Sequence, residues 1–390
     1  MSPSPRSSVP TPLVYRARSW LAVVGVALLA GCARDMRVAE PVPPRPADVR
    51  AQIERLLPSS TPDRAGWAVD IYAAFAALDI APSVSNLCAA LAVTEQESTL
   101  RADPPVANLP RIAWHEIDQR AERLGVPKAA VRFALQLTSP NGKRYSERID
   151  AVRTEKELSA IFEDFIGIVP MGQRLFGGLN PVRTGGAMQV SIQFAEQHAR
   201  ARDYPYEVDG SIRHEVFTRR GGMYFGIAHL LDYPATYDRQ LYRFADFNAG
   251  RYASRNAAFQ RALSRASGIA LELDGDLIRH GGDDDGRPGS TELAVRAIGK
   301  SLDLDRRAIR RALEQGDGTE FERSTLYKRV FDLAEKREGR VLPRAVVPRI
   351  ALKGPKISRK LTTEWFAKRV DGRYRRCLAR GGASGDAESL

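Results

Sequence analysis

Cysteine and histidine are scarce in this chain, with 3 cysteines and 5 histidines among 390 residues. The histidines show no metal-ligand spacing, and His115-Glu116 lacks the second histidine that a zinc-protease motif carries one helical turn later. A Walker phosphate loop, a dinucleotide-binding glycine motif and a Gly-x-Ser-x-Gly elbow are also missing. We therefore expect no metal and no cofactor.

Apolar runs are short as well. The run from Trp20 to Ala30 falls far below the ~20 residues that a membrane-spanning helix needs. Together with a mean hydropathy of -0.32, this excludes a multi-span membrane protein. Aromatic residues make up only 8% of the chain, but the hydrophobic fraction of 43% is enough for one large or two ordinary domains, which excludes wholesale disorder.

The short apolar run is typical of a signal peptide, because basic residues precede it. It ends in Leu29-Ala30-Gly31-Cys32, which resembles the bacterial lipobox, whose cysteine becomes the lipidated first residue of the mature chain. We expect residues 1–31 to be removed and Cys32 to carry a lipid that anchors the protein to a membrane. An ordinary export signal that happens to meet a cysteine is the alternative.

The residue after the lipidated cysteine predicts which of the two bacterial membranes the lipid anchors the protein to. In bacterial lipoproteins, an aspartate at this position is associated with retention in the inner membrane, and here the position is Ala33. By this resemblance we expect the periplasmic face of the outer membrane.

Positive charge is in excess, with 59 lysines and arginines against 47 acidic residues and a net charge of +12. Such a balance favours polyanionic partners. Because the chain is predicted to be exported, we do not expect nucleic acid to be one of them. Residues 323–380 hold 18 basic and only 5 acidic residues. We interpret this region either as a face that binds an anionic lipid or a protein partner, or as a solvated surface.

The fold class predicted is mainly α. Residues 32–49 are rich in proline and indicate an extended linker after the lipid anchor. Beyond them, apolar residues recur at helical spacing almost throughout. Strand signals are few, and the best is a hairpin around Ser139-Pro140-Asn141-Gly142.

Several helix starts are visible in the sequence. Thr61 is predicted to cap a helix that reaches Leu78, Ser83 or Ser85 to cap the next, and Thr154 to open a capping box. Further helices are predicted at residues 127–137, 188–202, 222–232, 255–266, 291–313 and 323–337.

Two cysteines remain after the lipidated one, Cys88 and Cys377. An exported chain can form a disulfide between them, but the sequence does not establish the pair. The apolar neighbours of Cys88 favour a simple core position for it.

Three short motifs stand out in order along the chain. Glu97-Ser98 ends an otherwise apolar helix, Gly186-Ala187-Met188-Gln189 is a glycine turn before a helix, and Phe247-Asn248-Ala249-Gly250 ends a third helix. In this order they resemble the lytic transglycosylases of the lysozyme-like superfamily, whose motifs run Glu-Ser, Gly-Leu-Met-Gln and Ala-Tyr-Asn-Ala-Gly. The chain is similar to a group of uncharacterised bacterial lipoproteins with a divergent core of this kind.

The resemblance implies a division of the chain into parts. A lysozyme-like domain is expected over residues 50–270, followed by a basic, mostly helical extension over residues 271–390. Within the domain, 89 residues separate Glu97 from Gly186, several times the gap that is usual in the family. We therefore expect a helical insertion at about residues 101–178.

The resemblance also implies an activity, the cleavage of peptidoglycan glycan strands with 1,6-anhydromuramic acid products. Glu97 would act as acid and then as base, while the substrate's own muramic C6 hydroxyl attacks C1. Such an acid must stay protonated near neutral pH, which a partly desolvated helix end favours. Helix spacing alone does not distinguish Glu97 from Glu95, and the motif selects Glu97.

The remaining motif residues are assigned by the resemblance to substrate binding: Ser98, Met188, Gln189, Phe247 and Asn248. The polar members would hold the sugar or orient the acid, and the two apolar members would form cleft walls. The chain departs from the family pattern at three positions, where glycine, leucine and tyrosine are usual: Thr99, Ala187 and Phe247.

Two alternatives remain open at this point. A hydrolytic muramidase would need a second carboxylate, for which Asp246 is the candidate. A catalytically inactive relative would bind peptidoglycan and link it to the outer membrane. The three departures favour this second alternative, whereas Glu97, Gln189 and Asn248 argue against it.

Overall fold

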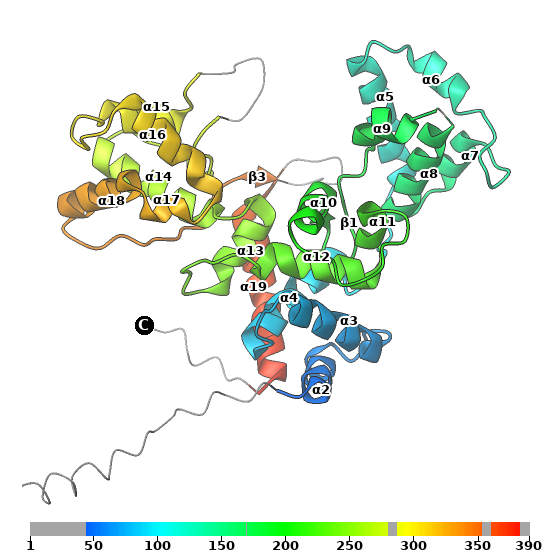
Figure 1. Ribbon diagram of the computed structural model, residues 1–390, viewed down its shortest axis with the longest axis horizontal. Helices are drawn as coiled ribbons and strands as arrows, with labels where there is room; N and C mark the ends of the chain where they lie inside the picture. Colours follow the sequence, from blue (N-terminus) through cyan, green and yellow to red (C-terminus); the bar gives the residue numbers. More distant parts are fainter. Residues whose placement is uncertain (1–43, 169, 280–286, 353–359, 383–390) are drawn as a thin grey trace, which may run out of the picture. The chain divides into compact units, whose positions relative to one another are not determined.

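A computed structural model describes residues 44–168, 170–279, 287–352 and 360–382. Helices dominate this part of the chain, so the mainly α prediction is confirmed, and the strands found there form two short antiparallel pairs (Figure 1). None of the helices described is long and apolar enough to span a bilayer. The predicted signal peptide and Cys32 lie outside the described residues.

Helix α4 (Val84–Ser98) is the centre of the first hydrophobic core. Each residue from Leu87 to Thr94 is buried, so the helix is covered on all sides. Ser83 caps its start, as one of the two predicted positions, because its hydroxyl accepts a hydrogen bond from Asn86 N at 3.2 Å. The other helices of this core are α2 (Pro46–Leu56), α3 (Arg64–Ala77), α10 (Ile192–Ala201), α11 (Ile212–Val216), α12 (Arg219–Leu231), α13 (Gln240–Ala249) and α19 (Thr363–Arg380).

Two helix starts differ from the prediction. Helix α2 begins at Pro46, inside the predicted linker, because proline fits the first helical position and Asp48 supports the first turn. Helix α3 begins after Asp63, not after Thr61. The carboxylate of Asp63 accepts from Gly66 N at 3.1 Å and so takes the capping role predicted for Thr61.

The insertion predicted at about residues 101–178 is helical. It contains α5 (Leu109–Arg123), α6 (Lys128–Ala134), α7 (Tyr145–Ala151), α8 (Glu155–Gly167), α9 (Gly172–Phe176) and the 3-10 helix η3 (Gly177–Leu179). Thr154 forms the predicted capping box with Glu157 at the start of α8.

The predicted hairpin around Ser139–Gly142 is not formed, and two short hairpins lie elsewhere in the described chain. At Ser139–Gly142 the chain makes a closed turn, with Ser139 N bonded to Lys143 O at 2.8 Å, but one isolated bridge replaces the expected strands because α6 and α7 flank the turn closely. One hairpin is instead β1 (Thr184–Gly185) with β2 (Val190–Ser191), so the helix predicted over residues 188–202 begins only at Ile192. The other pair is β3 (Ala351–Leu352) with β4 (Leu361–Thr362).

A second hydrophobic core forms from the helices between residues 253 and 338. These are α14 (Ala253–Ser267), α15 (Ser290–Ala297), α16 (Arg306–Leu313), η4 (Glu314–Asp317), α17 (Glu320–Arg323) and α18 (Thr325–Glu338). The single helix predicted over residues 291–313 is two helices. The chain breaks between them because Asp303 has a left-handed φ of 47° and Asp305 caps a new helix through Ala308 N.

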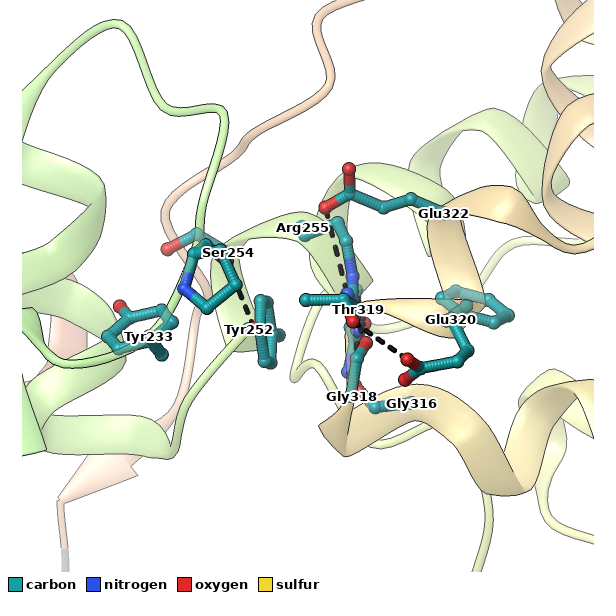
Figure 2. A network of polar contacts seen from close by, with 12 residues as sticks. Tyr233, Tyr252, Ser254, Arg255, Gly316, Gly318, Thr319, Glu320 and Glu322 are labelled. Carbon is teal, nitrogen blue, oxygen red and sulfur yellow. Dashed lines mark hydrogen bonds and ion pairs between the residues drawn. The ribbon is translucent and has the colours of Figure 1, made fainter.

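Arg255, in the first turn of α14, joins this second core to its surroundings. Its guanidinium is buried with 1% exposure, donates to Gly318 O at 2.7 Å and to Gly316 O, and lies 4.2 Å from the ring centre of Tyr252 (Figure 2). Glu322 approaches it to 3.7 Å. A buried cation with this many partners is a structural anchor.

Helix α19 belongs to the first core, although it lies in the region that the sequence assigns to a basic extension. It packs along α4 and α13. A disulfide between Cys88 and Cys377 joins α19 to α4, so the pair that the sequence leaves open is formed. Both cysteines are buried, which also agrees with the core position expected for Cys88.

Candidate functional site

Glu97 is the next-to-last residue of α4 and is half-buried. The helix ends directly after it because Thr99 and Leu100 both adopt left-handed conformations, with φ of 52° and 59°. Ser98 is 3% exposed, and its hydroxyl donates to Thr94 O at 3.0 Å and accepts from Arg101 N at 3.2 Å. Ser98, predicted to bind substrate, therefore stabilises the end of the helix that carries Glu97.

The structure separates the roles of the two neighbouring carboxylates. Glu95 lies 3.5 Å from Arg373 Nε and 3.7 Å from Arg376 on α19. Burial lowers the pKa of Arg373, and the charges of Glu95 and, more weakly, Glu97 oppose that shift. Glu95 thus pairs with arginines of α19. The choice of Glu97 as the acid stays a prediction from the motif.

The turn between β1 and β2 carries the second motif. Gly186 has a φ of 72°, and a Cβ on it would collide with the carbonyl oxygen of Val216, so only glycine fits there. Gln189 is half-buried; its side-chain oxygen accepts from the Thr184 hydroxyl at 3.3 Å and its amide donates to Gly186 O at 3.4 Å. The amide is therefore oriented by the turn itself.

Helix α12 links this turn to α4. Met188 is fully buried, and it packs so closely on Gly226 of α12 that a Cβ at Gly226 would collide with its side chain. On the same helix, the sulfur of Met223 lies 3.7 Å from the hydroxyl of Thr94 in α4. Met188, predicted as a cleft wall, thus fastens the turn to the core.

The third motif ends α13. Phe247 is half-buried, with its ring 5.1 Å from the imidazole of His229 on α12, and its carbonyl oxygen lies 3.4 Å from His229 Nε2. Burial lowers the pKa of His229 to about 4, so the ring is neutral near pH 7. Asn248 is exposed and accepts from the Thr363 hydroxyl at the start of α19 at 3.0 Å.

Asp246, the candidate second carboxylate, is 1% exposed. It accepts from the hydroxyls of Tyr233 at 3.2 Å and Tyr237 at 2.6 Å, and from the backbone N–H groups of Tyr252 at 3.0 Å and Ser254 at 2.7 Å. Burial raises the pKa of Asp246, although these hydrogen bonds oppose the shift. Its oxygens are occupied in shaping the α13–α14 corner, which leaves no place for an attacking water.

The three motifs therefore sit on elements that share neighbours. Helix α12 contacts α4, β2 and α13, and α19 contacts both α13 and α4. Sequence reasoning missed three residues of this framework: His229, Thr363 and Arg373. The signal that could have located the last two is the cysteine pair, because linking Cys88 to Cys377 places α19 beside α4.

A cavity of about 910 Å³ is lined by residues of α8, η3, β2, α10 and α11, and Glu97 does not line it. Within the described ranges no cluster of histidine, cysteine or acidic residues is arranged to hold a metal ion.

Part of the positive charge in residues 323–380 is used inside the protein. Arg344 bonds to Glu335 at 2.6 Å and lies 3.9 Å above the ring of Phe331. Arg329 donates to Asp303 O at 2.9 Å. Fewer cations of this region are therefore available to bind a partner than its composition suggests.

Comparison with known proteins gives a family without an assigned activity. Residues 60–380 match the family described as "Protein of unknown function (DUF1615)". The chain is 54% identical over 360 residues to "Uncharacterized protein YaiW" of Escherichia coli (strain K12), covering 92% of this chain and 98% of that protein. No solved structure is significantly similar to the chain.

Proposed function

The chain belongs to the DUF1615 family of unknown function, and we propose that it cleaves peptidoglycan glycan strands by lytic transglycosylation. The observation that carries this proposal is the position of Glu97, half-buried near the end of a helix in which every residue from Leu87 to Thr94 is buried. A carboxyl group at such a boundary is partly desolvated yet reachable, which is what a general acid requires.

The proposed reaction uses this one carboxyl twice. Protonated Glu97 donates its proton to the glycosidic oxygen as the bond from that oxygen to C1 breaks. The C6 hydroxyl of the same muramic acid then attacks C1, and Glu97 takes the hydroxyl proton. No water is consumed, and the product ends in 1,6-anhydromuramic acid. Gln189 and Asn248 are proposed to hold the sugar, each with a side chain oriented by a neighbouring hydroxyl.

The surroundings of the other two carboxylates support a single-acid mechanism. Glu95 is paired with arginines of α19, and Asp246 is buried with its oxygens hydrogen-bonded. A hydrolytic enzyme of this type would need a second carboxylate with room for a water. We therefore prefer transglycosylation to hydrolysis.

The proposed location fits this substrate. A lipid on Cys32 would tether the protein to the periplasmic face of the outer membrane, within reach of the peptidoglycan layer. This part of the proposal rests on the lipobox-like sequence alone, because Cys32 lies outside the described residues.

The test is the release of soluble glycan from purified sacculi by the full chain in detergent solution. We expect Glu97→Gln to reduce the release rate by about a hundredfold or more, because general acid–base catalysis is worth at least that much. The matched control, Glu122→Gln at an exposed carboxylate of α5, should retain the rate within about twofold. Both variants should still sediment with sacculi.

Two results would overturn the assignment. Release by Glu97→Gln at the wild-type rate would remove Glu97 as the acid. Binding of the wild-type protein to sacculi without any release would favour the non-catalytic peptidoglycan-binding lipoprotein instead.

A further inference from the structure

The cavity of about 910 Å³ beside β2 is formed jointly by the predicted insertion and the first core. Helix α8 and η3 line it from the insertion, and α10, α11 and the residues before β1 line it from the core (Figure 1 labels α8, α10 and α11). Its volume of about 910 Å³ suits a short peptide. The candidate site and this cavity share the hairpin, because Gln189 is in its turn and Arg183 precedes its first strand.

Part of the charge in the cavity is already paired. The carboxylate of Glu163 accepts from the hydroxyl of Ser159 at 3.1 Å and lies 2.7 Å from His214 Nε2 and 3.7 Å from Arg213 Nε. Arg213 also donates to Val182 O at 2.9 Å. Glu163, His214 and Arg213 therefore form one side of the cavity, where their charged groups are paired with one another.

Two opposite charges of the lining are available to a ligand. Among the described residues, neither the guanidinium of Arg183 nor the carboxylate of Glu196 has a hydrogen-bond or ion-pair partner. Both line the cavity together with the half-buried Arg213. Burial lowers the pKa of Arg213, the carboxylates of Glu163 and Glu196 oppose the shift, and the charge of Arg183 adds to it. One cavity thus offers a free cation from the residue before β1 and a free anion from α10.

We propose that this cavity binds the peptide stem of peptidoglycan through an amino acid that carries both a carboxylate and an ammonium group. Arg183 binds the carboxylate, with which its planar guanidinium pairs well, and Glu196 binds the ammonium. This inference rests on the proposed function, because it names the part of the substrate beside the glycan. It also gives the insertion a purpose, since α8 completes the cavity.

The test is calorimetric titration of the full chain with the tripeptide L-Ala-γ-D-Glu-meso-diaminopimelate. Both Arg183→Gln and Glu196→Gln should weaken binding about tenfold or more, because each removes a charged hydrogen bond. The matched control is Arg200→Gln, an exposed arginine of α10 outside the lining, which should leave the affinity unchanged. With the L-alanine amine already blocked by an acetyl group, as the glycan blocks it in peptidoglycan, acetylating the diaminopimelate amine should weaken binding to the wild type but not weaken it further in Glu196→Gln.

Several results would overturn the subsite. They are no binding of the tripeptide to the wild type, equal affinity in all three variants, or an acetylation penalty that persists in Glu196→Gln. A disaccharide carrying the same tripeptide should bind more tightly than the free tripeptide, whereas equal affinities would overturn the assignment to the glycan-linked stem. Because these titrations need no cleavage, they remain informative if Glu97 proves inactive.

Discussion

His229 is the buried group for which the direction of titration is clearest. Burial lowers the pKa of its imidazole from 6.5 to about 4, the cation of Arg251 adds to the shift, and the carbonyl of Phe247 opposes it. In the unfolded chain His229 is therefore protonated below pH 6.5, whereas in the folded protein it is protonated only below about pH 4. The stability that His229 contributes is complete above pH 6.5 and is lost as the pH falls through that window.

Replacing His229 tests this linkage. Between about pH 6.5 and about pH 4 the wild type should lose about 3 kcal/mol more unfolding free energy than His229→Gln, which cannot take up the proton. Urea denaturation at several pH values measures the difference. Arg200→Gln, at an exposed side chain of α10, should keep the wild-type acid loss. Parallel acid losses in the wild type and His229→Gln would contradict the assignment.

The sequence located individual residues only where a local pattern carries the information. It placed Glu97, Gln189 and Asn248 at helix ends or turns, and the structure agrees with these positions. It did not anticipate that Ser98 and Met188 are buried, because their contacts come from a helix end and from a helix far along the chain. His229 was missed for the same reason, because its contacts are with Phe247 of a different helix.

Helix α19 is held to α4 by the Cys88–Cys377 disulfide, by Glu95 with its two arginines, and by a 2.9 Å hydrogen bond between the Ser85 and Tyr374 hydroxyls. Its N-terminus also contacts Asn248 through Thr363. The helix therefore supports both the acid and the third motif from one side.

Removing the disulfide should destabilise the protein strongly, because it closes a loop of 289 residues. We expect Cys88→Ala with Cys377→Ala to lower the unfolding free energy by about 3–5 kcal/mol, measured by urea denaturation. Reductant should destabilise the wild type similarly and leave the double variant unchanged. A wild type that is insensitive to reductant, with its thiols shown to be free, would contradict this role.

At the level of helices and strands, spacing located helices such as α14 and α18, but it did not reveal every helix end, and one predicted cap, Thr61, was wrong. Ser83 and Thr154 start their helices as predicted. Apolar residues recur at helical spacing over residues 291–313, but the helix is broken there. Asp303 has a left-handed conformation and Asp305 caps a new helix. The hairpin at residues 184–191 was overlooked because its strands are only two residues long.

The described chain builds two hydrophobic cores, and Arg255 is buried where the second begins. Arg255→Gln would leave the carbonyls of Gly316 and Gly318 without their charged donor. We expect a loss of about 3 kcal/mol in unfolding free energy, measured by urea denaturation. Arg265→Gln, at a side chain that is 58% exposed, should cost less than about 0.5 kcal/mol. Equal losses would show that Arg255 is no anchor.

For the molecule as a whole, composition and helical periodicity predicted the mainly α class, which the structure confirms. The insertion follows only from the resemblance to the lytic transglycosylases and stays a prediction. Composition and periodicity did not predict that the chain returns after residue 360 to complete the first core. That return depends on contacts between residues nearly 300 positions apart, such as Cys88 with Cys377, and no local pattern encodes such a pairing without an alignment.

The most direct test of the central claim is the mass of the fragments that the wild-type protein releases from sacculi in water enriched in heavy oxygen. Transglycosylation predicts 1,6-anhydromuramic acid ends, one water lighter than reducing ends and free of the label, and none of them from Glu97→Gln. Reducing ends that carry one labelled oxygen would contradict the account, because they would show that a water, and not the substrate's own C6 hydroxyl, attacks C1.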